Sequence, residues 1–270
     1  MEFVNQLIRS RKSVRSYDEQ PLREGDLKKL SAFIKKIDNP YGIPVEFRLL
    51  DAREHGLSSP VITGERLYVG AKLRRVPHME ESFGYDFEQL VLYAQSLGVG
   101  TVWIGGTMNR SVFEKAMELR DGEVMPCVSP LGHPAKKPSF RDAMMRRGVR
   151  ADSRHAFESM FFDGALDTPL MEASAGRLIE PLEAVRWSPS AVNKQPWRVI
   201  ITGHAAHFYL KHSKGFANTK EGNMQKIDMG IAMCHFYLSA TEQGMNLRFS
   251  LDNPGIAVDN DMEYIASYQF

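Results

Sequence analysis

The first residues whose types and spacing suit chemistry form the run Arg11-Lys12-Ser13-Val14-Arg15, called here the basic run. It places three cations and one hydroxyl within five residues. A guanidinium can hold two phosphate oxygens at once, and an ammonium adds a point charge. The basic run therefore suits a phosphate dianion. The alternative is a solvated basic turn, because charged residues commonly lie on the surface.

A second group lies in residues 188–197, which read Ser-Pro-Ser-Ala-Val-Asn-Lys-Gln-Pro-Trp and are called here the Pro-Ser loop. Its two prolines restrict the backbone and so help to hold the hydroxyl and amide side chains in place. An amide offers both a donor and an acceptor, which matches the edge of a planar heterocycle. A helix-to-strand turn without a ligand is the alternative.

Residues 98–106, called here the glycine segment, read Gly-Val-Gly-Thr-Val-Trp-Ile-Gly-Gly. The β-branched and aromatic residues predict a strand over 100–106 that is closed by Gly105 and Gly106. Glycine lets a ligand approach the backbone closely. The order helix, glycine, strand differs from a dinucleotide-binding fingerprint, in which the strand comes first. A tight turn without a ligand is the alternative.

Residues 131–138 read Leu-Gly-His-Pro-Ala-Lys-Lys-Pro and are followed by Arg141. This segment could add a cation to an anion site. The alternative is a solvated basic loop.

Composition excludes several classes of protein. The 270-residue chain has a formal net charge of +1, so no strong overall field attracts nucleic acid or an anionic membrane. Its two cysteines, Cys127 and Cys234, make neither a disulfide framework nor a zinc site, and the histidines show no convincing metal pattern. No run approaches the roughly 20 apolar residues of a membrane span, and residues 1–14 lack a signal peptide's apolar stretch. We expect a cytoplasmic protein without a metal.

Hydrophobic periodicity and turn residues predict alternating helices and strands. Residues 136–154 are interpreted as a basic crossover. The coarse pattern indicates an α+β fold with helices on antiparallel or mixed sheets. The expected helices are 3–8, 23–37, 85–97, 111–119 and 173–187, and the expected extended segments are 45–50, 66–71, 100–106, 125–130 and 197–201.

The second half repeats the first in weak form. Helix 173–187 corresponds to helix 23–37, and Ala240–Gly244 corresponds to Ala94–Gly98. A proline precedes a strand in each half, at Pro44 and at Pro196. The common order predicts an internal duplication. We therefore divide the chain into similar halves, 1–150 and 151–270.

Together the four motifs resemble the nitroreductase family of flavoproteins. The family has a basic run after a short helix, a Pro-Ser-x-x-Asn-x-Gln-Pro-Trp loop, a Gly-x-Gly-Thr-x-Trp-Ile-Gly-Gly segment and a Leu-Gly-x-Pro segment. The chain resembles in particular a subfamily in which one polypeptide holds two such halves. This resemblance implies a nitroreductase-like fold and FMN as the cofactor.

The sequence departs from ordinary members of that family in one respect. They carry the Pro-Ser loop soon after the basic run, whereas here that place is taken by residues 38–44, which lack the motif. Family members are homodimers in which one subunit supplies the basic run and the other supplies the Pro-Ser loop. The resemblance thus implies an internal pseudo-dimer in which a single chain can act as a monomer. We expect one flavin per chain, because residues 161–165 and 245–250 lack the parts of a reciprocal site.

The resemblance also implies residue roles. Arg11 and Ser13 hold the phosphate, and Arg15 lies near the pyrimidine edge, where a cation stabilises the charge that builds on reduction. A backbone N–H of Gly105 or Gly106 faces flavin N5. No side chain is assigned as catalytic. The expected cofactor-binding set is Arg11, Lys12, Ser13, Arg15, Ile104, Gly105, Gly106, Arg141, Pro189, Ser190, Ala191 and Asn193.

The implied activity is an FMN-dependent oxidoreductase that uses NAD(P)H to reduce nitroaromatics, quinones or similar small planar electron acceptors by a ping-pong mechanism. The alternative is a flavin-binding or sensor protein of the same fold without turnover. Fast reduction by NAD(P)H separates the two. A third hypothesis, a nucleic-acid-binding module, rests on two basic segments alone, and the near-neutral charge argues against it. We expect neither nucleic acid nor membrane as a partner.

Overall fold

The computed structural model describes residues 3–136, 148, 152–214 and 219–270. The chain divides into two compact units. The first unit is residues 10–151, and the second unit is residues 1–9 with 152–270. The units thus group residues 1–9 with the second half of the chain. Arg141 and most of the predicted crossover 136–154 lie outside the described residues.

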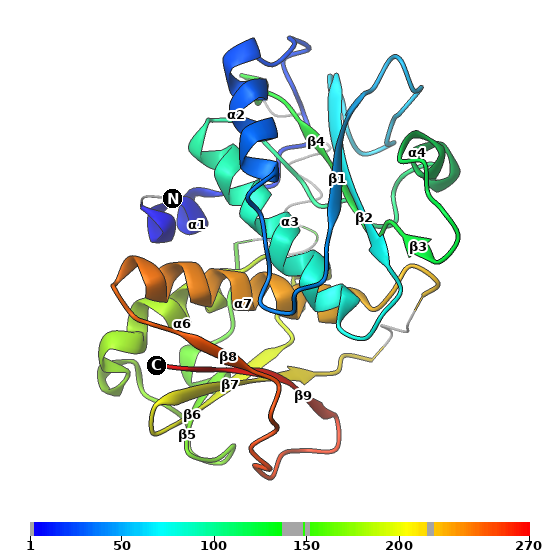
Figure 1. The fold of residues 1–270 in the computed structure, drawn as a ribbon. Coiled ribbons are helices and arrows are strands. Elements are labelled where there is room, and N and C mark those ends of the chain that lie inside the picture. The colour runs from blue at the N-terminus through cyan, green and yellow to red at the C-terminus, as the bar shows by residue number, and fades with distance from the viewer. Residues whose placement is uncertain (1–2, 137–147, 149–151, 215–218) are drawn as a thin grey trace. The chain divides into compact units, whose positions relative to one another are not determined.

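The first unit is built on an antiparallel sheet (Figure 1). Strand β2 (Leu67–Arg74) pairs with β1 (Glu46–Asp51), β3 (Glu123–Val124) and β4 (Val128–Leu131). Tyr68 to Leu73 are all buried, as a central strand requires. These strands confirm the predicted segments 45–50 and 66–71.

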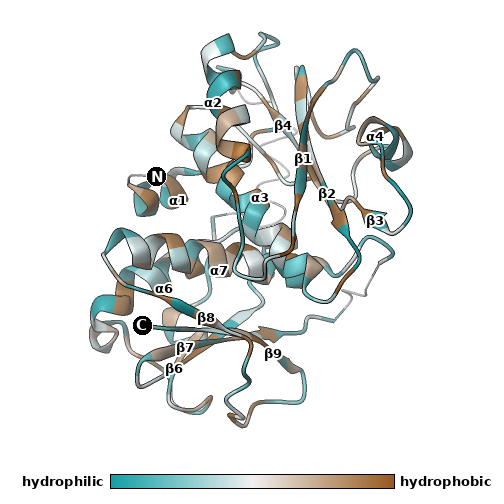
Figure 2. Cartoon of the chain, viewed as in Figure 1, coloured by the Kyte–Doolittle hydropathy of each residue, from teal (hydrophilic) through white to brown (hydrophobic). Residues whose placement is uncertain are grey.

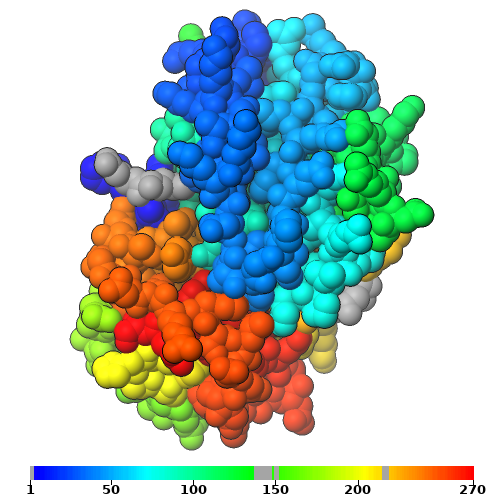
Figure 3. Space-filling view, viewed as in Figure 1, coloured from blue at the N-terminus to red at the C-terminus, as the bar shows by residue number. Residues whose placement is uncertain are grey.

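The helices that accompany this sheet between residues 10 and 136 are α2 (Glu24–Ile34), α3 (Met79–Ser96) and α4 (Arg110–Ala116). Figure 2 shows hydrophilic and hydrophobic bands along α2, and Leu30 is its one buried residue. The blue stretch of the chain that includes α2 lies on the visible face of this unit in Figure 3. Helix α3 is mostly buried and begins six residues earlier than predicted.

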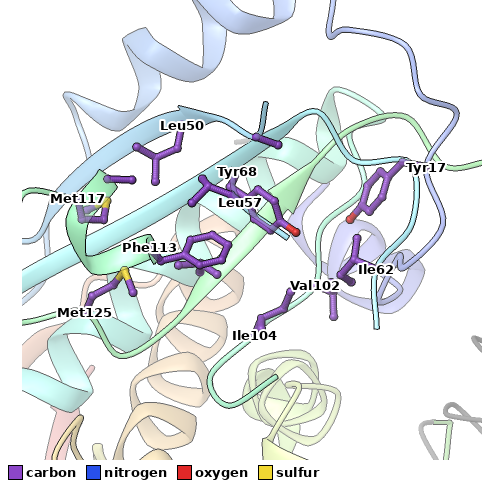
Figure 4. Close-up of a cluster of buried hydrophobic side chains, with 13 residues drawn as sticks. Tyr17, Leu50, Leu57, Ile62, Tyr68, Val102, Ile104, Phe113, Met117 and Met125 are labelled. Atoms are coloured by element: carbon purple, nitrogen blue, oxygen red, sulfur yellow. The ribbon is translucent and has the colours of Figure 1, made fainter. Parts of the chain in front are cut away.

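The core of the first unit also anchors the motif segments. Tyr17 follows the basic run, and Val102 and Ile104 belong to the glycine segment; all three side chains are buried in the cluster shown in Figure 4. The ring of Tyr68 meets that of Phe113 edge-on, with centroids 4.9 Å apart. The hydrophobic effect therefore holds the backbone of both motifs against the sheet.

The predicted strand 100–106 is wrong as a continuous strand. Gly100 and Ile104 form isolated antiparallel bridges with Gly132 and Val128. The same register would place Val102 opposite Pro130, which has no N–H to donate. The amide of Val102 instead donates to the hydroxyl of Ser129 at 3.0 Å. Proline thus interrupts the ladder and leaves an extended segment beside β4.

The second unit contains a five-stranded sheet in the order β5-β6-β7-β9-β8. Strand β5 runs parallel to β6, and the other pairs are antiparallel. Helix α1 ends in Arg9 and Ser10, the point at which the two units divide. The elements are α1 (Val4–Ser10), β5 (Phe161–Asp163), α6 (Ile179–Arg186), β6 (Trp197–Thr202), β7 (Ala205–Lys211), α7 (Met224–Glu242), β8 (Arg248–Ser250) and β9 (Met262–Gln269).

The predicted helix 173–187 forms only in its second part, α6. Two short 3-10 turns, Glu172–Ser174 and Gly176–Leu178, precede it. Gly176 has φ +53°, which lies outside the right-handed helical region. A continuous helix cannot pass through that residue.

Each unit has the same order of helix, antiparallel hairpin, long helix and a strand that pairs with the second hairpin strand. The ends of the long helices α3 and α7 also match. Gly98 and Gly244 have φ +72° and +75°. The next amides close the helices at 2.9 Å from Val99 to Ala94 and 3.0 Å from Met245 to Ala240. The α+β fold class is confirmed, with glycine providing the left-handed cap in both units.

Within the described ranges, no helix combines the length and the hydropathy that crossing a bilayer requires.

Candidate functional site

Three of the four motifs come together in the first unit. Ser13 of the basic run forms a parallel bridge with Thr101 of the glycine segment, and the amide of Val14 donates to the Thr101 carbonyl at 2.9 Å. The glycine segment meets the 131–138 segment through the Gly100–Gly132 bridge. Backbone hydrogen bonds therefore place the cations of the basic run beside the glycine segment.

Tyr17, just after the basic run, joins that part of the chain directly to the 131–138 segment. It bridges to Pro134, and the neighbouring amide of Ala135 donates to the Ser16 carbonyl at 2.9 Å. A Cβ on Gly132 would lie 2.7 Å from the Tyr17 ring, and one on Gly100 would lie 2.8 Å from the Val14 side chain. Close packing within the chain explains both glycines.

Gly106 differs from those two glycines. A Cβ on Gly106 would meet no atom within 4 Å, and its φ is not positive. Nothing in the described chain therefore requires glycine at this position. Gly106 is exposed and Gly105 is half-buried. Open space beside an exposed backbone is where a ligand can approach the peptide groups.

The peptide groups of this turn are anchored through their carbonyls. The Ile104 carbonyl accepts from the amide of Val128 at 2.9 Å, and the Gly105 carbonyl accepts from the guanidinium of Arg110. In a trans peptide the next N–H points the opposite way. The amides of Gly105 and Gly106 therefore point away from these anchors, and neither has a partner in the part of the chain that the structure describes.

The glycine segment is also held from α3. The indole N–H of Trp103 donates to the carboxylate of Glu88 at 3.0 Å. Glu88 is fully buried, and the Trp103 ring packs on Phe87 with centroids 4.7 Å apart. Glu88 and Phe87 thus fix Trp103, which lies between Val102 and Ile104.

The cations of the basic run have unequal exposure. Arg11, Ser13 and Arg15 are half-buried, while Lys12 is exposed. The Arg15 carbonyl accepts from the amide of Thr63 at 2.9 Å, so its backbone is fixed. Half-buried guanidinium groups hold an anion better than fully exposed ones, because water screens them less.

The Pro-Ser loop lies in the second unit and has a strained backbone. Val192, Asn193 and Gln195 have φ +44°, +57° and +49°. This left-handed region is uncommon for non-glycine residues and costs most for β-branched ones such as Val192. Val192 is also 59% exposed, so no packing of its side chain offsets the strain. Concentrated strain of this kind is typical of functional loops.

Two residues of α7 hold the Pro-Ser loop in this conformation. Both carboxylate oxygens of Asp228 accept from the amide of Ala191, at 3.0 and 3.1 Å. Two turns further along, His235 Nδ1 lies 2.9 Å from the hydroxyl of Ser188. Burial raises the pKa of the Asp228 carboxyl well above its ordinary value, although the hydrogen bond from the Ala191 amide opposes the shift.

The rest of the loop is tied to the segment that precedes β5. The side-chain nitrogen of Asn193 donates to the Ser153 carbonyl at 3.1 Å, and the side-chain oxygen of the buried Gln195 accepts from the backbone amide of His155 at 3.0 Å. The hydroxyl of Ser190 accepts from the Gln195 amide at 2.9 Å. Asn193 and Ser190 therefore also stabilise the loop itself.

The predicted cofactor-binding residues thus fall into two sets and one exception. In the first unit, the Ser13–Thr101 bridge joins the basic run, which holds Arg11, Lys12, Ser13 and Arg15, to the glycine segment, which holds Ile104, Gly105 and Gly106. In the second unit, Pro189, Ser190, Ala191 and Asn193 share the strained loop. Arg141 lies outside the described residues. No group of three or more potential metal ligands gathers in the described residues.

Four supporting residues were not predicted: Glu88, Arg110, Asp228 and His235. All lie outside the four motifs, and each reaches its partner across 5 to 47 residues of sequence. A polar residue inside the apolar pattern of a helix was the available signal for Glu88, Asp228 and His235.

The fold and these motifs define the nitroreductase-like class. The chain matches the family model described as "Putative TM nitroreductase" over residues 4–240 and belongs to this family. A crystal structure of a "putative nitroreductase" from Thermotoga maritima MSB8 has a TM-score of 0.61 and 19% identity, and the match covers 98% of this chain and 93% of that one. At that identity the likeness shows the fold.

Other similar structures cover about half of this chain. One is a "Putative NADH dehydrogenase/NAD(P)H nitroreductase" from Bacteroides thetaiotaomicron VPI-5482, with a TM-score of 0.44, 21% identity, and coverage of 52% of this chain and 92% of that one. Another is an FMN-dependent nitroreductase from Clostridium difficile R20291, with a TM-score of 0.42, 15% identity, and coverage of 52% and 92%. No curated protein matches the chain in sequence.

Proposed function

We propose that this protein is an FMN-dependent oxidoreductase that uses NAD(P)H to reduce nitroaromatics, quinones or similar small planar electron acceptors. Family membership supports an oxidoreductase. The observation that carries the proposal is the Gly105–Gly106 turn. Its two amides point away from anchored carbonyls, beside open space, and the half-buried polar residues Arg11, Ser13 and Arg15 of the basic run lie in the same unit.

The residues present fit FMN. A phosphate needs cations and donors, which Arg11 and Ser13 supply, with Lys12 and Arg141 as helpers. A flavin ring needs N–H donors at a place that a side chain does not block, which Gly105 and Gly106 supply. When bound, FMN would accept a hydride from the nicotinamide and pass reducing equivalents to the second substrate.

The chain's own part in the reaction is binding and orientation. Arg15 supplies a permanent positive charge for the pyrimidine edge of the ring, where negative charge builds on reduction. The amides of Gly105 and Gly106 would line the other edge, while Ile104, whose amide donates to the Val128 carbonyl at 2.9 Å, would hold the backbone beside it. No side chain is assigned a proton transfer. The two substrates are proposed to use one site in turn, by a ping-pong mechanism.

The Pro-Ser loop is proposed to serve the same site. Pro189, Ser190, Ala191 and Asn193 would line the ring, and the strain of the loop supports a binding role. Because the basic run and the Pro-Ser loop come from the proposed halves 1–150 and 151–270, one chain would complete the site as an internal pseudo-dimer. This part rests on the motif resemblance.

The visible spectrum of purified protein, with chromatography of the heat-released ligand, tests the cofactor. We expect FMN, because no adenine-binding fingerprint is present in the sequence. Release of FAD, or no flavin bound after reconstitution, would refute the proposal. Stopped-flow reduction separates the two candidate functions. The flavin of an enzyme is bleached quickly by NAD(P)H, whereas the flavin of a sensor without turnover is not.

A further inference from the structure

We infer that Arg110 is a positioning residue that orients the Gly105–Gly106 peptide, so that the N–H of Gly106 is the strong donor presented to the bound flavin. This inference rests on the proposed function. It goes further by choosing between the two candidate amides and by naming the side chain that controls the chosen one.

The guanidinium of Arg110 joins two separate segments. It donates to the carbonyl of Gly105, to that of Met125 at 2.6 Å and to that of Pro126 at 3.3 Å. Arg110 is the first residue of α4, and Met125 is fully buried in the core of the first unit. The guanidinium is therefore held by the core and in turn holds the turn at Gly105.

Fixing this carbonyl fixes the next amide. The atoms of a trans peptide lie in one plane, with the C=O and the following N–H pointing in opposite directions. Arg110 holds the Gly105 oxygen, so the N–H of Gly106 points away from Arg110. The hydroxyl of Ser59 donates to the Thr107 carbonyl at 2.6 Å, so the backbone is anchored on the other side of Gly106 as well.

The other candidate amide, that of Gly105, is not oriented by a charged donor. The Ile104 carbonyl, which orients the N–H of Gly105, accepts from a neutral backbone amide. A charged donor makes a stronger hydrogen bond and polarises the peptide that accepts it. The N–H of Gly106 is thereby the stronger donor of the two. A Cβ at Gly106 would meet nothing within 4 Å, so the space beside the Gly106 Cα is open.

The expected consequence is electrostatic. A polarised N–H and a nearby permanent cation stabilise an electron-rich ligand more than an electron-poor one. Arg110 should therefore favour the reduced cofactor over the oxidised one. Its removal should change the ratio of their dissociation constants and with it the reduction potential, which a role in folding alone would leave unchanged.

The test compares the flavin-loaded wild type with Arg110→Met and Arg110→Gln. We expect Arg110→Met to bind oxidised flavin nearly as tightly and reduced flavin about tenfold more weakly. For a two-electron couple this lowers the potential by about 30 mV. Arg110→Gln keeps a neutral donor, and its reduction potential should lie between those of the wild type and Arg110→Met. If Arg110→Met does not fold, Arg110→Gln still reports on the charge.

Arg48→Met is the matched control. Arg48 lies in the same unit and also donates to a backbone carbonyl, that of Ala116 at 3.3 Å, but it does not contact the glycine segment. Its removal should leave the potential unchanged. The inference is overturned if folded Arg110→Met and Arg110→Gln keep the wild-type potential, or if Arg48→Met shifts it equally. A wild type that binds no flavin would instead overturn the proposed function, and this inference with it.

Discussion

Trp103 and Glu88 join the glycine segment to α3 through one hydrogen bond, 3.0 Å from the indole nitrogen to the carboxylate. Glu88 is fully buried, so the bond satisfies a group that water cannot reach. The opposite edge of the segment bonds to β4. The segment that carries Gly105 and Gly106 is thus held from two directions.

Trp103→Phe should lower the free energy of unfolding by about 1–3 kcal/mol, because it leaves the buried Glu88 carboxylate without this donor. Urea unfolding measures the loss. Trp187→Phe is the control: it removes a similar indole bond to Glu183, at 3.2 Å, but Glu183 keeps Arg186 at 2.5 Å. The free energy of unfolding should therefore fall less in Trp187→Phe than in Trp103→Phe. Equal losses would contradict the idea that the ion pair with Arg186 compensates Glu183.

Asp228→Ala should weaken the binding of FMN and of riboflavin by similar factors, about tenfold each, if the Pro-Ser loop serves the ring. The loss of one acceptor frees the Ala191 amide, and a loop with three left-handed residues then relaxes. Asp228→Asn keeps an acceptor and should bind nearly as the wild type does. Flavin titration measures both, and an Asn variant as weak as the Ala variant would contradict this account.

Arg11→Ala should weaken FMN about tenfold or more and riboflavin much less, since a hydrogen bond to a charged group contributes about 1.5–3 kcal/mol. Titration of apoprotein with each ligand measures the difference. Lys12→Ala is the comparison, and its smaller effect should follow from the exposure of Lys12. A loss that is equal for both ligands would place Arg11 away from the phosphate.

Asp86 should make stability fall as pH rises toward neutral. Burial raises the pKa of Asp86 to about 7, although hydrogen bonding by Asn39 at 2.8 Å opposes the shift. A carboxyl whose folded pKa lies above its unfolded pKa contributes stability at low pH, and this contribution is lost between about pH 4 and pH 7. Asp86→Asn should flatten this part of the unfolding profile. An unchanged slope would assign the dependence to other groups.

Arg15→Ala and Asn193→Ala should impair the same flavin site, with about one flavin per chain in the wild type. Unfolding and refolding a mixture of the two variants tests whether one chain completes the site. Within a single chain each polypeptide keeps its own lesion, so mixing should restore nothing. Recovered flavin binding or NAD(P)H oxidation would show that the site forms between chains, and the family assignment would stand.

Local patterns were sufficient for much of this protein. Periodicity located α2, β1, β2 and β6, and the motifs identified the family, because amphipathic spacing and proline or glycine positions act over a few residues. The left-handed caps at Gly98 and Gly244 follow from the same local chemistry. The weak repeat likewise predicted the shared order of elements in the two units.

Only the tertiary structure decided which distant residues support the motifs. Pro130 interrupts the expected strand because the register of the Gly100–Gly132 and Ile104–Val128 bridges would place it opposite Val102, and register does not follow from local preference. Asp228 reaches Ala191 across 37 residues and Ser13 meets Thr101 across the unit, whereas propensity and periodicity describe short windows. Hydrogen bonds between segments arise only when the core brings their backbones together, and that is where Arg110, Asp228 and Glu88 gain their partners.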